Sequence, residues 1–180
     1  RPLIKMWQAL QRGWIPPENL SEEEYESLKE GKGPPWLRAF AGFGCSYSGK
    51  WFGGYARGES RNFAGEAHRS LLKKIDKIHN RTYFECQDYK EFHPPYNSLI
   101  YCDPPYQGKT NYDAFDKPFN HSEFWDKIRH WSKFCEVYVS EYEAPDDFKC
   151  VLEMNVTVTV SKDGKGQKAT EKVFTLGDES

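Results

Sequence analysis

The chain has 180 residues, of which 38% are hydrophobic and 29% are charged, and its formal net charge is -2. This balance is typical of one folded domain and excludes a disordered or collagen-like chain. No run of sequence approaches the roughly 20 apolar residues that a membrane span needs. The five cysteines are an odd number without paired short spacings. They predict neither a disulfide framework nor a structural zinc site, which favours a reducing compartment such as the cytoplasm.

Positive charge is concentrated in one part of this slightly acidic chain. Residues 31–74 hold eight Lys or Arg side chains against two Glu, together with many glycines and aromatic residues. This combination suits a surface that follows nucleic-acid phosphates. An ordinary solvated face with a local excess of charge explains the same pattern. The chain begins at Arg1, before its first methionine at Met6, so we expect a fragment of a longer gene product.

The first part of the chain is predicted to be helical. The spacing of apolar side chains indicates a helix over residues 2–11. A second helix is expected over 22–30, because Ser21 and Glu24 have the spacing of a capping box. A third is expected over 65–79. Its predicted buried face consists of Ala67, Leu71, Leu72 and Ile75.

Between the second and third of these helices, residues 40–58 are rich in glycine and aromatic side chains and fit neither a regular strand nor a regular helix.

After the third helix, the pattern changes to alternating strands and helices. Strands are predicted over residues 82–86 and 98–102. A helix over 122–134 and a third strand over 136–140 follow. This alternation indicates parallel strands joined by helical crossovers.

The end of the chain predicts an antiparallel hairpin. Residues 155–160 and 170–176 alternate between apolar and polar side chains, and the polar residues 162–166 form the expected tip. The fold class is therefore α/β, with a sheet that ends in an antiparallel hairpin. We expect one domain over residues 1–180.

The most informative motif is Asp103-Pro104-Pro105-Tyr106, which directly follows the expected strand 98–102. Ligands of open α/β sheets bind at that edge. The carboxylate and the carbonyl of Pro104 can accept both N–H bonds of an exocyclic amine, which directs the nitrogen lone pair outward. Consecutive prolines stiffen the backbone, and Tyr106 offers a flat face for a base swung out of its stack. A strand terminator with a packed tyrosine is the alternative.

The tetrapeptide resembles the catalytic signature of S-adenosylmethionine-dependent amino-methyltransferases, which act on N6 of adenine or N4 of cytosine. Residues 43–57, 140–148 and 168–174 are similar to segments of phage-type, Dam-like DNA adenine methylases. The resemblance thus extends over nearly the whole chain. It implies a Rossmann-like methyltransferase sheet, S-adenosylmethionine as cofactor and double-stranded DNA as partner. The implied reaction is methylation of a flipped-out adenine at N6.

The resemblance also implies where the cofactor binds. Asp88 matches the acidic position that holds the cofactor's adenine amine, Tyr89 would lie beside that adenine, and Asp103 would border the cofactor. An aspartate after a strand is otherwise usually a turn or helix cap. Residues 40–44 could pass for the glycine loop that cradles the cofactor, but no apolar strand precedes them. In the family, a segment like residues 2–4 follows both that loop and the ribose-binding acid, so we expect the methyltransferase domain to be N-terminally incomplete.

Basic and aromatic side chains supply the candidate DNA contacts. They are Lys50, Trp51, Tyr55 and Arg57 in a helical and Gly-aromatic insertion over residues 14–60, and Lys109 and Tyr112 in the loop 107–120. Such side chains suit phosphate contact and base stacking, and the loop could close over the flipped nucleotide. The interval between Asp88 and Asp103 is too short for the recognition domain that many relatives insert there. An irregular loop whose aromatic residues lie in the core is the alternative for residues 42–57.

Two other functions stay open. A truncated methylase relative without cofactor binding would be a non-catalytic nucleic-acid-binding or interaction module. A cytosine N4 or RNA target would be compatible with the same tetrapeptide. The five histidines show no metal-ligand spacing, so no metal site is predicted.

Overall fold

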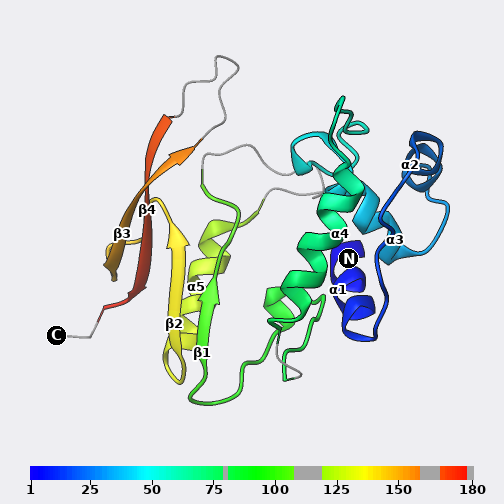
Figure 1. Ribbon diagram of the computed structural model, residues 1–180. Coiled ribbons are helices and arrows are strands. Elements are labelled where there is room, and N and C mark those ends of the chain that lie inside the picture. The colour runs from blue at the N-terminus through cyan, green and yellow to red at the C-terminus, as the bar shows by residue number, and fades with distance from the viewer. Residues whose placement is uncertain (79–80, 108–118, 159–166, 178–180) are drawn as a thin grey trace. The chain divides into compact units, whose positions relative to one another are not determined.

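Two units, Arg1–Gln87 and Asp88–Ser180, make up the chain, and each has a hydrophobic core of its own. The computed structural model describes residues 1–78, 81–107, 119–158 and 167–177 (Figure 1). Within these ranges, every helix is too short or too polar to cross a bilayer.

The first unit begins with two short helices. Helix α1 covers Pro2–Gln11, as predicted, and starts with a proline at its first position, where a missing N–H costs nothing. Helix α2 covers Glu22–Lys29. Its predicted capping box is confirmed, because the Glu24 amide donates to Ser21 Oγ at 3.1 Å and the Ser21 amide donates to Glu24 Oε2 at 2.7 Å.

Two further helices complete this unit. Helix α3 covers Pro35–Ala39, and the sequence patterns did not predict it. Helix α4 covers Phe63–Ile75, so it begins two residues before the predicted start and ends before the predicted end. Asn62 explains the early start, because its side chain accepts a hydrogen bond from the Gly65 amide at 2.9 Å.

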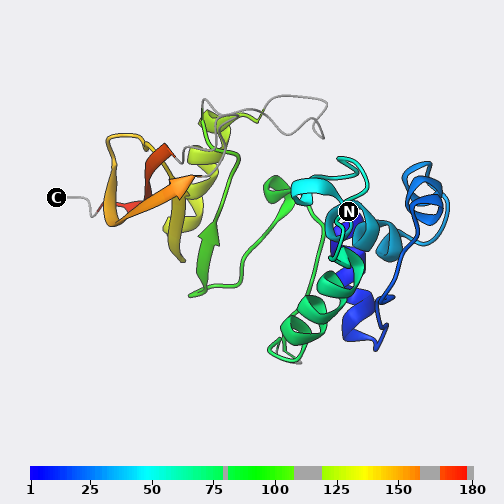
Figure 2. The ribbon, with the colours of Figure 1, turned by 45° about the horizontal axis from the view of Figure 1, so that its top comes forward.

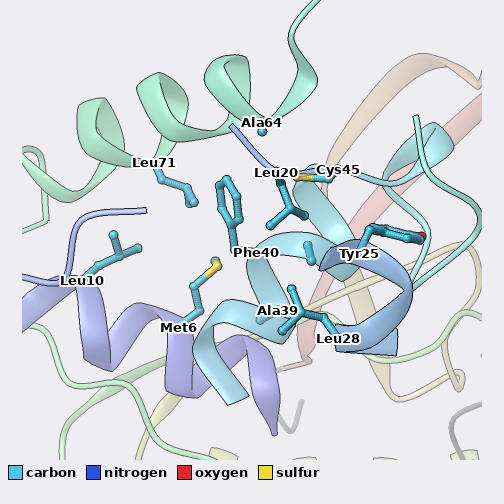
Figure 3. Packing of buried hydrophobic residues seen from close by; sticks show 11 residues of the cluster. Met6, Leu10, Leu20, Tyr25, Leu28, Ala39, Phe40, Cys45, Ala64 and Leu71 are labelled. Atoms are coloured by element: carbon cyan, nitrogen blue, oxygen red, sulfur yellow. The ribbon is translucent and has the colours of Figure 1, made fainter. Parts of the chain in front are cut away.

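The core of the first unit is centred on Phe40, which is 1% exposed. Its ring lies among Met6, Leu20 and Leu71, from three different segments (Figure 3). Phe40 begins the π-helical turn η1, Phe40–Gly44.

Two glycines of η1 are explained by close packing. A Cβ atom on Gly42 would lie 2.7 Å from the Trp51 ring, and one on Gly44 would lie 2.9 Å from the Ala67 Cβ. Core packing therefore accounts for both glycines without a ligand.

After η1 the chain forms an irregular loop, as the composition of residues 40–58 predicts. A short 3-10 turn, η2, covers Tyr47–Gly49. A single antiparallel bridge joins Ser46 to Tyr55. The Tyr47 amide donates to the Gly54 carbonyl at 2.9 Å. These bonds hold the base of the loop, while Lys50 and its neighbours remain outside regular structure.

The predicted strand over residues 82–86 is wrong. This segment has no strand partner among the described residues. The side-chain amide of Gln8 donates to the Phe84 carbonyl at 2.6 Å, and that of Gln11 donates to the Thr82 carbonyl at 2.8 Å. Side chains of α1 thus occupy carbonyls that a neighbouring strand would otherwise use, and a strand requires a backbone ladder.

The second unit contains a four-stranded sheet in the order β1-β2-β4-β3. Its strands are β1 (Leu99–Cys102), β2 (Glu136–Glu141), β3 (Phe148–Val158) and β4 (Gln167–Leu176). Strands β1 and β2 are parallel, whereas β4 is antiparallel to both of its neighbours. The predicted parallel pair and closing hairpin are therefore confirmed, although β3 begins earlier than expected. The predicted tip, residues 162–166, lies outside the described residues.

Helix α5 (His121–Ser132) is the predicted crossover between the parallel strands, and Asn120 caps it. It packs against one face of the β1–β2 pair (Figures 1 and 2). Ile128 of the helix and Val139 of β2 are both 0% exposed. The short strand β1 is less buried than its apolar sequence suggests, because Leu99 is 66% exposed.

Candidate functional site

The tetrapeptide 103–106 leaves the sheet at the carboxyl end of β1, as predicted. Strands β1 and β2 run parallel with Cys102 opposite Val139. The residues after Cys102 therefore emerge at the same edge as Ser140 and Glu141, the last two residues of β2.

Burial differs along the tetrapeptide. Asp103 is exposed, Pro104 is buried, and Pro105 and Tyr106 are half-buried. A buried proline with a fixed φ holds the backbone rigid directly beside an accessible carboxylate. Burial also raises the pKa of the preceding Cys102 thiol to about 11, so this thiol stays neutral at physiological pH.

Both the hydroxyl and the ring of Tyr106 are held by the end of β2. The hydroxyl is hydrogen-bonded to Ser140 Oγ at 3.1 Å. The ring meets Tyr142 edge to face, with 4.9 Å between centroids. Burial raises the pKa of Tyr106, an effect that the hydrogen bond to Ser140 opposes and the nearby charge of Asp103 reinforces. Tyr106 therefore remains a neutral phenol at neutral pH.

Glu141 lies behind this loop and is 2% exposed. One carboxylate oxygen accepts the Gln107 amide at 2.7 Å, and the other accepts the Tyr142 amide at 2.7 Å. His121 Nδ1 lies 3.8 Å from Oε1 of the same carboxylate. The sequence patterns assign no function to Ser140 or Glu141. One sequence signal bears on Glu141. It alternates with the apolar residues Val137 and Val139, and this spacing places its side chain on the face of the strand that points toward the core.

Asp88 and Tyr89 begin the second unit. Asp88 caps the 3-10 turn η3, Tyr89–Glu91, by accepting the Lys90 amide at 3.0 Å. Its carboxylate is nevertheless exposed. The Tyr89 ring contacts Phe124 of α5, and its hydroxyl is buried without a hydrogen-bond partner among the described residues. Burial raises the pKa of this tyrosine.

A shared core connects η3 to the strand before the tetrapeptide. Tyr89, Ile100 and Cys102 all pack against the same buried cluster. In addition, the Lys90 ammonium lies 2.6 Å from a carboxylate oxygen of Glu123 in α5. Asp88 and Asp103 are therefore each adjacent in sequence to a residue that packs against the same core, and both carboxylates are exposed.

Lys50 and Trp51, two of the candidate DNA contacts, are accessible on the irregular loop of the first unit. Lys50 is exposed, and Trp51 is 42% exposed. The Trp51 ring packs against Phe43 at 5.0 Å and against Phe52 at 4.7 Å between centroids. This packing holds the indole in place while part of it remains in solvent.

Tyr55 and Arg57 already have partners within the first unit. The Tyr55 hydroxyl donates to the Leu20 carbonyl at 2.7 Å, and its ring packs against Tyr25. The exposed Arg57 guanidinium forms an ion pair with Glu22. Their DNA contacts remain predictions. Lys109 and Tyr112 lie outside the described residues.

Comparison with known protein families bears directly on this site. Residues 44–159, more than half of the chain, match the sequence model of the D12 class N6 adenine-specific DNA methyltransferase family. The chain belongs to this family. No curated protein matches it.

The matched range of this adenine-specific DNA methyltransferase includes every described candidate residue of both units. The predicted enzyme class is therefore confirmed, and DNA is its substrate. Family membership favours the enzyme over a non-catalytic binding module, and it supports adenine over cytosine as the target base.

Proposed function

We propose that this methyltransferase transfers a methyl group from S-adenosylmethionine to N6 of an adenine flipped out of double-stranded DNA. The observation that carries the proposal is the arrangement of residues 103–106 at the carboxyl edge of the parallel pair. There an exposed carboxylate follows β1, and Tyr106 is fastened to the end of β2.

Asp103 and Pro104 would hold the reacting amine. The lone pair of the adenine amine is delocalised into the ring, so the nitrogen is a poor nucleophile. When its two N–H groups donate to the Asp103 carboxylate and the Pro104 carbonyl, the lone pair points outward for attack. Because Pro104 is buried, this acceptor pair is rigid, and rigid positioning is the main contribution that a methyl transfer needs. Asp103 need not be a strong base, since the amine proton becomes acidic only after transfer.

Tyr106 would stack against the flipped base. Its ring is supported edge to face by Tyr142 and its hydroxyl by Ser140. A tyrosine held at two points presents its ring with little conformational entropy to lose on binding. Its neutral phenol adds no charge beside the base.

The residues present fit the adenosine part of the cofactor. Asp88 has an exposed carboxylate that can accept the cofactor's adenine amine. The next residue, Tyr89, has a buried hydroxyl without a hydrogen-bond partner among the described residues. Bound S-adenosylmethionine supplies an electrophilic methyl group on a sulfonium sulfur. Asp103 would border the bound cofactor as well as hold the reacting amine.

The loop of the first unit would contact the DNA backbone. Lys50 and Trp51 offer an exposed cation and a partly exposed ring, which suit a phosphate and a base face. Tyr55 and Arg57 would support the same loop, and Arg57 could exchange its exposed pairing with Glu22 for a phosphate at little cost.

The experiment that tests this proposal separates chemistry from DNA binding. For Asp103→Ala we expect single-turnover methylation of duplex DNA to fall by about a hundredfold or more, because the variant loses a charged acceptor in the transition state. DNA affinity in a fluorescence titration should stay close to that of the wild type. Asp146→Ala removes another exposed carboxylate of the same unit and serves as the control. Wild-type methylation by Asp103→Ala would contradict the mechanism.

A further inference from the structure

Glu141 stands out because it is a charged side chain in a buried position. Among the described residues, the other fully buried polar side chains are the serines Ser46 and Ser140. Burial of an ionised carboxylate is costly unless hydrogen bonds replace the lost water. The side chain is thus held in place by specific partners.

The hydrogen-bond donors to Glu141 are two backbone amides on different segments, while His121 Nδ1, at 3.8 Å, lies beyond hydrogen-bond distance. One oxygen accepts the amide of Tyr142, the residue that follows Glu141 itself. The other accepts the amide of Gln107, which directly follows the tetrapeptide. Because both bonds are 2.7 Å long and end on a carboxylate, they are charge-assisted and stronger than bonds between neutral groups. The carboxylate therefore connects the end of β2 to the loop that carries Tyr106.

Ser140 provides a second connection to the same loop. Its hydroxyl bonds the hydroxyl of Tyr106, whereas Glu141 bonds the backbone one residue later. These neighbours point to opposite faces of β2, so they hold the loop from two directions.

We propose that Glu141 is a positioning residue for methyl transfer. Its buried carboxylate clamps the Gln107 amide and thereby sets the orientation of Tyr106 and of the Pro104 carbonyl. It touches neither substrate nor cofactor and acts only through the backbone. This inference rests on the proposed function of the tetrapeptide. A displacement of about 1 Å in a catalytic group can cost about a hundredfold in rate, which is why such a clamp has kinetic consequences.

The variant that tests the clamp is Glu141→Gln. It preserves the shape of the side chain, but its single carbonyl oxygen cannot accept both amides, and its NH2 group opposes one of them. Glu143→Gln changes an exposed glutamate two residues away and serves as the matched control.

Hydrogen exchange of the Gln107 amide measures the clamp without any activity. We expect exchange in Glu141→Gln to be about tenfold faster than in the wild type, with Glu143→Gln unchanged. Equal exchange in Glu141→Gln and the wild type would overturn the clamp. If Glu141→Gln does not fold, hydrogen exchange in the wild type alone tests the clamp. A wild-type Gln107 amide without protection from exchange would also overturn the clamp.

Steady-state kinetics then measure positioning. We expect kcat per folded molecule of Glu141→Gln to fall by about ten- to a hundredfold, while KM for DNA stays nearly constant. A purely structural function would lower the folded fraction and leave kcat per folded molecule unchanged, and that result would overturn the proposal. If the wild type itself transfers no methyl group, the proposed function fails, whereas hydrogen exchange still decides whether the clamp exists.

Discussion

At the scale of single residues, Tyr106 combines two separable features. Its ring is the proposed stacking surface for the base, whereas its hydroxyl bonds Ser140 at 3.1 Å. Substitutions that remove one feature or both therefore distinguish the stacking surface from the connection to β2.

For Tyr106→Phe we expect a loss of less than about tenfold in methylation rate, because a neutral hydrogen bond contributes only about 1 kcal/mol. For Tyr106→Ala we expect a loss of about ten- to a hundredfold, because stacking of a base on an aromatic ring contributes about 1–3 kcal/mol. Single-turnover rates at saturating DNA measure both effects. Equal losses in the two variants would contradict a stacking function of the ring.

Residues of the candidate site could be predicted from the sequence where the signal is local, but not where it depends on packing. Asp103 and Tyr106 belong to a contiguous motif that can be recognised in the sequence without knowledge of the rest of the fold. Glu141 directly follows the predicted strand 136–140, and its alternation with Val137 and Val139 is a weak signal that does not establish its burial. Its burial arises only when β1, α5 and β4 surround the end of β2.

At the scale of secondary-structure elements, an ion pair fastens α5 to the start of β3. Arg129 of α5 donates two hydrogen bonds to the Asp147 carboxylate, at 2.6 Å and 2.9 Å, and its guanidinium lies over the Phe148 ring. The hydrogen bonds from Arg129 lower the pKa of Asp147. The helix that covers the parallel pair is thereby tied to the hairpin.

The lowered pKa of Asp147 predicts a pH-dependent contribution to stability. A depressed pKa in the folded state means that stabilisation is present above the unfolded value, near pH 4, and is lost as the pH falls through the folded value. For Asp147→Asn we expect a loss of about 0.5–1 kcal/mol in the free energy of unfolding at pH 7, because both side chains of the pair are partly exposed to solvent.

Urea unfolding at pH 7 and at about pH 2.5 measures this difference. The difference in the free energy of unfolding between Asp147→Asn and the wild type should be smaller at the lower pH. Asp146→Asn serves as the control for a neighbouring exposed carboxylate. A gap that is the same at both pH values would show that the ion pair is not its cause.

Whether an element could be predicted depended on where its hydrogen-bond partner lies. Helices α1 and α2 satisfy their own backbones, and the hairpin β3–β4 pairs with a neighbour in sequence, so local patterns were sufficient. The segment 82–86 has the composition of a strand but required a distant partner. Instead, Gln8 and Gln11 of α1 bond its carbonyls.

At the scale of the whole molecule, the family match extends across both units. It begins at Gly44, the last residue of η1 in the first unit, and ends at residue 159 of the second unit. The two units therefore share one family pattern, with the candidate DNA contacts Lys50, Trp51, Tyr55 and Arg57 in the first and the tetrapeptide in the second. Excess positive charge in residues 31–74 of an otherwise acidic chain agrees with this division.

Identification of the methylated base tests directly whether this protein methylates adenine at N6. The wild-type protein is incubated with duplex DNA and S-adenosylmethionine that carries a deuterated methyl group, and the digested nucleosides are analysed by mass spectrometry. We predict deuterated N6-methyladenine with the wild type and with Asp146→Ala, and almost none with Asp103→Ala. DNA binding without methyl transfer by the wild type, or N4-methylcytosine as the product, would contradict the account.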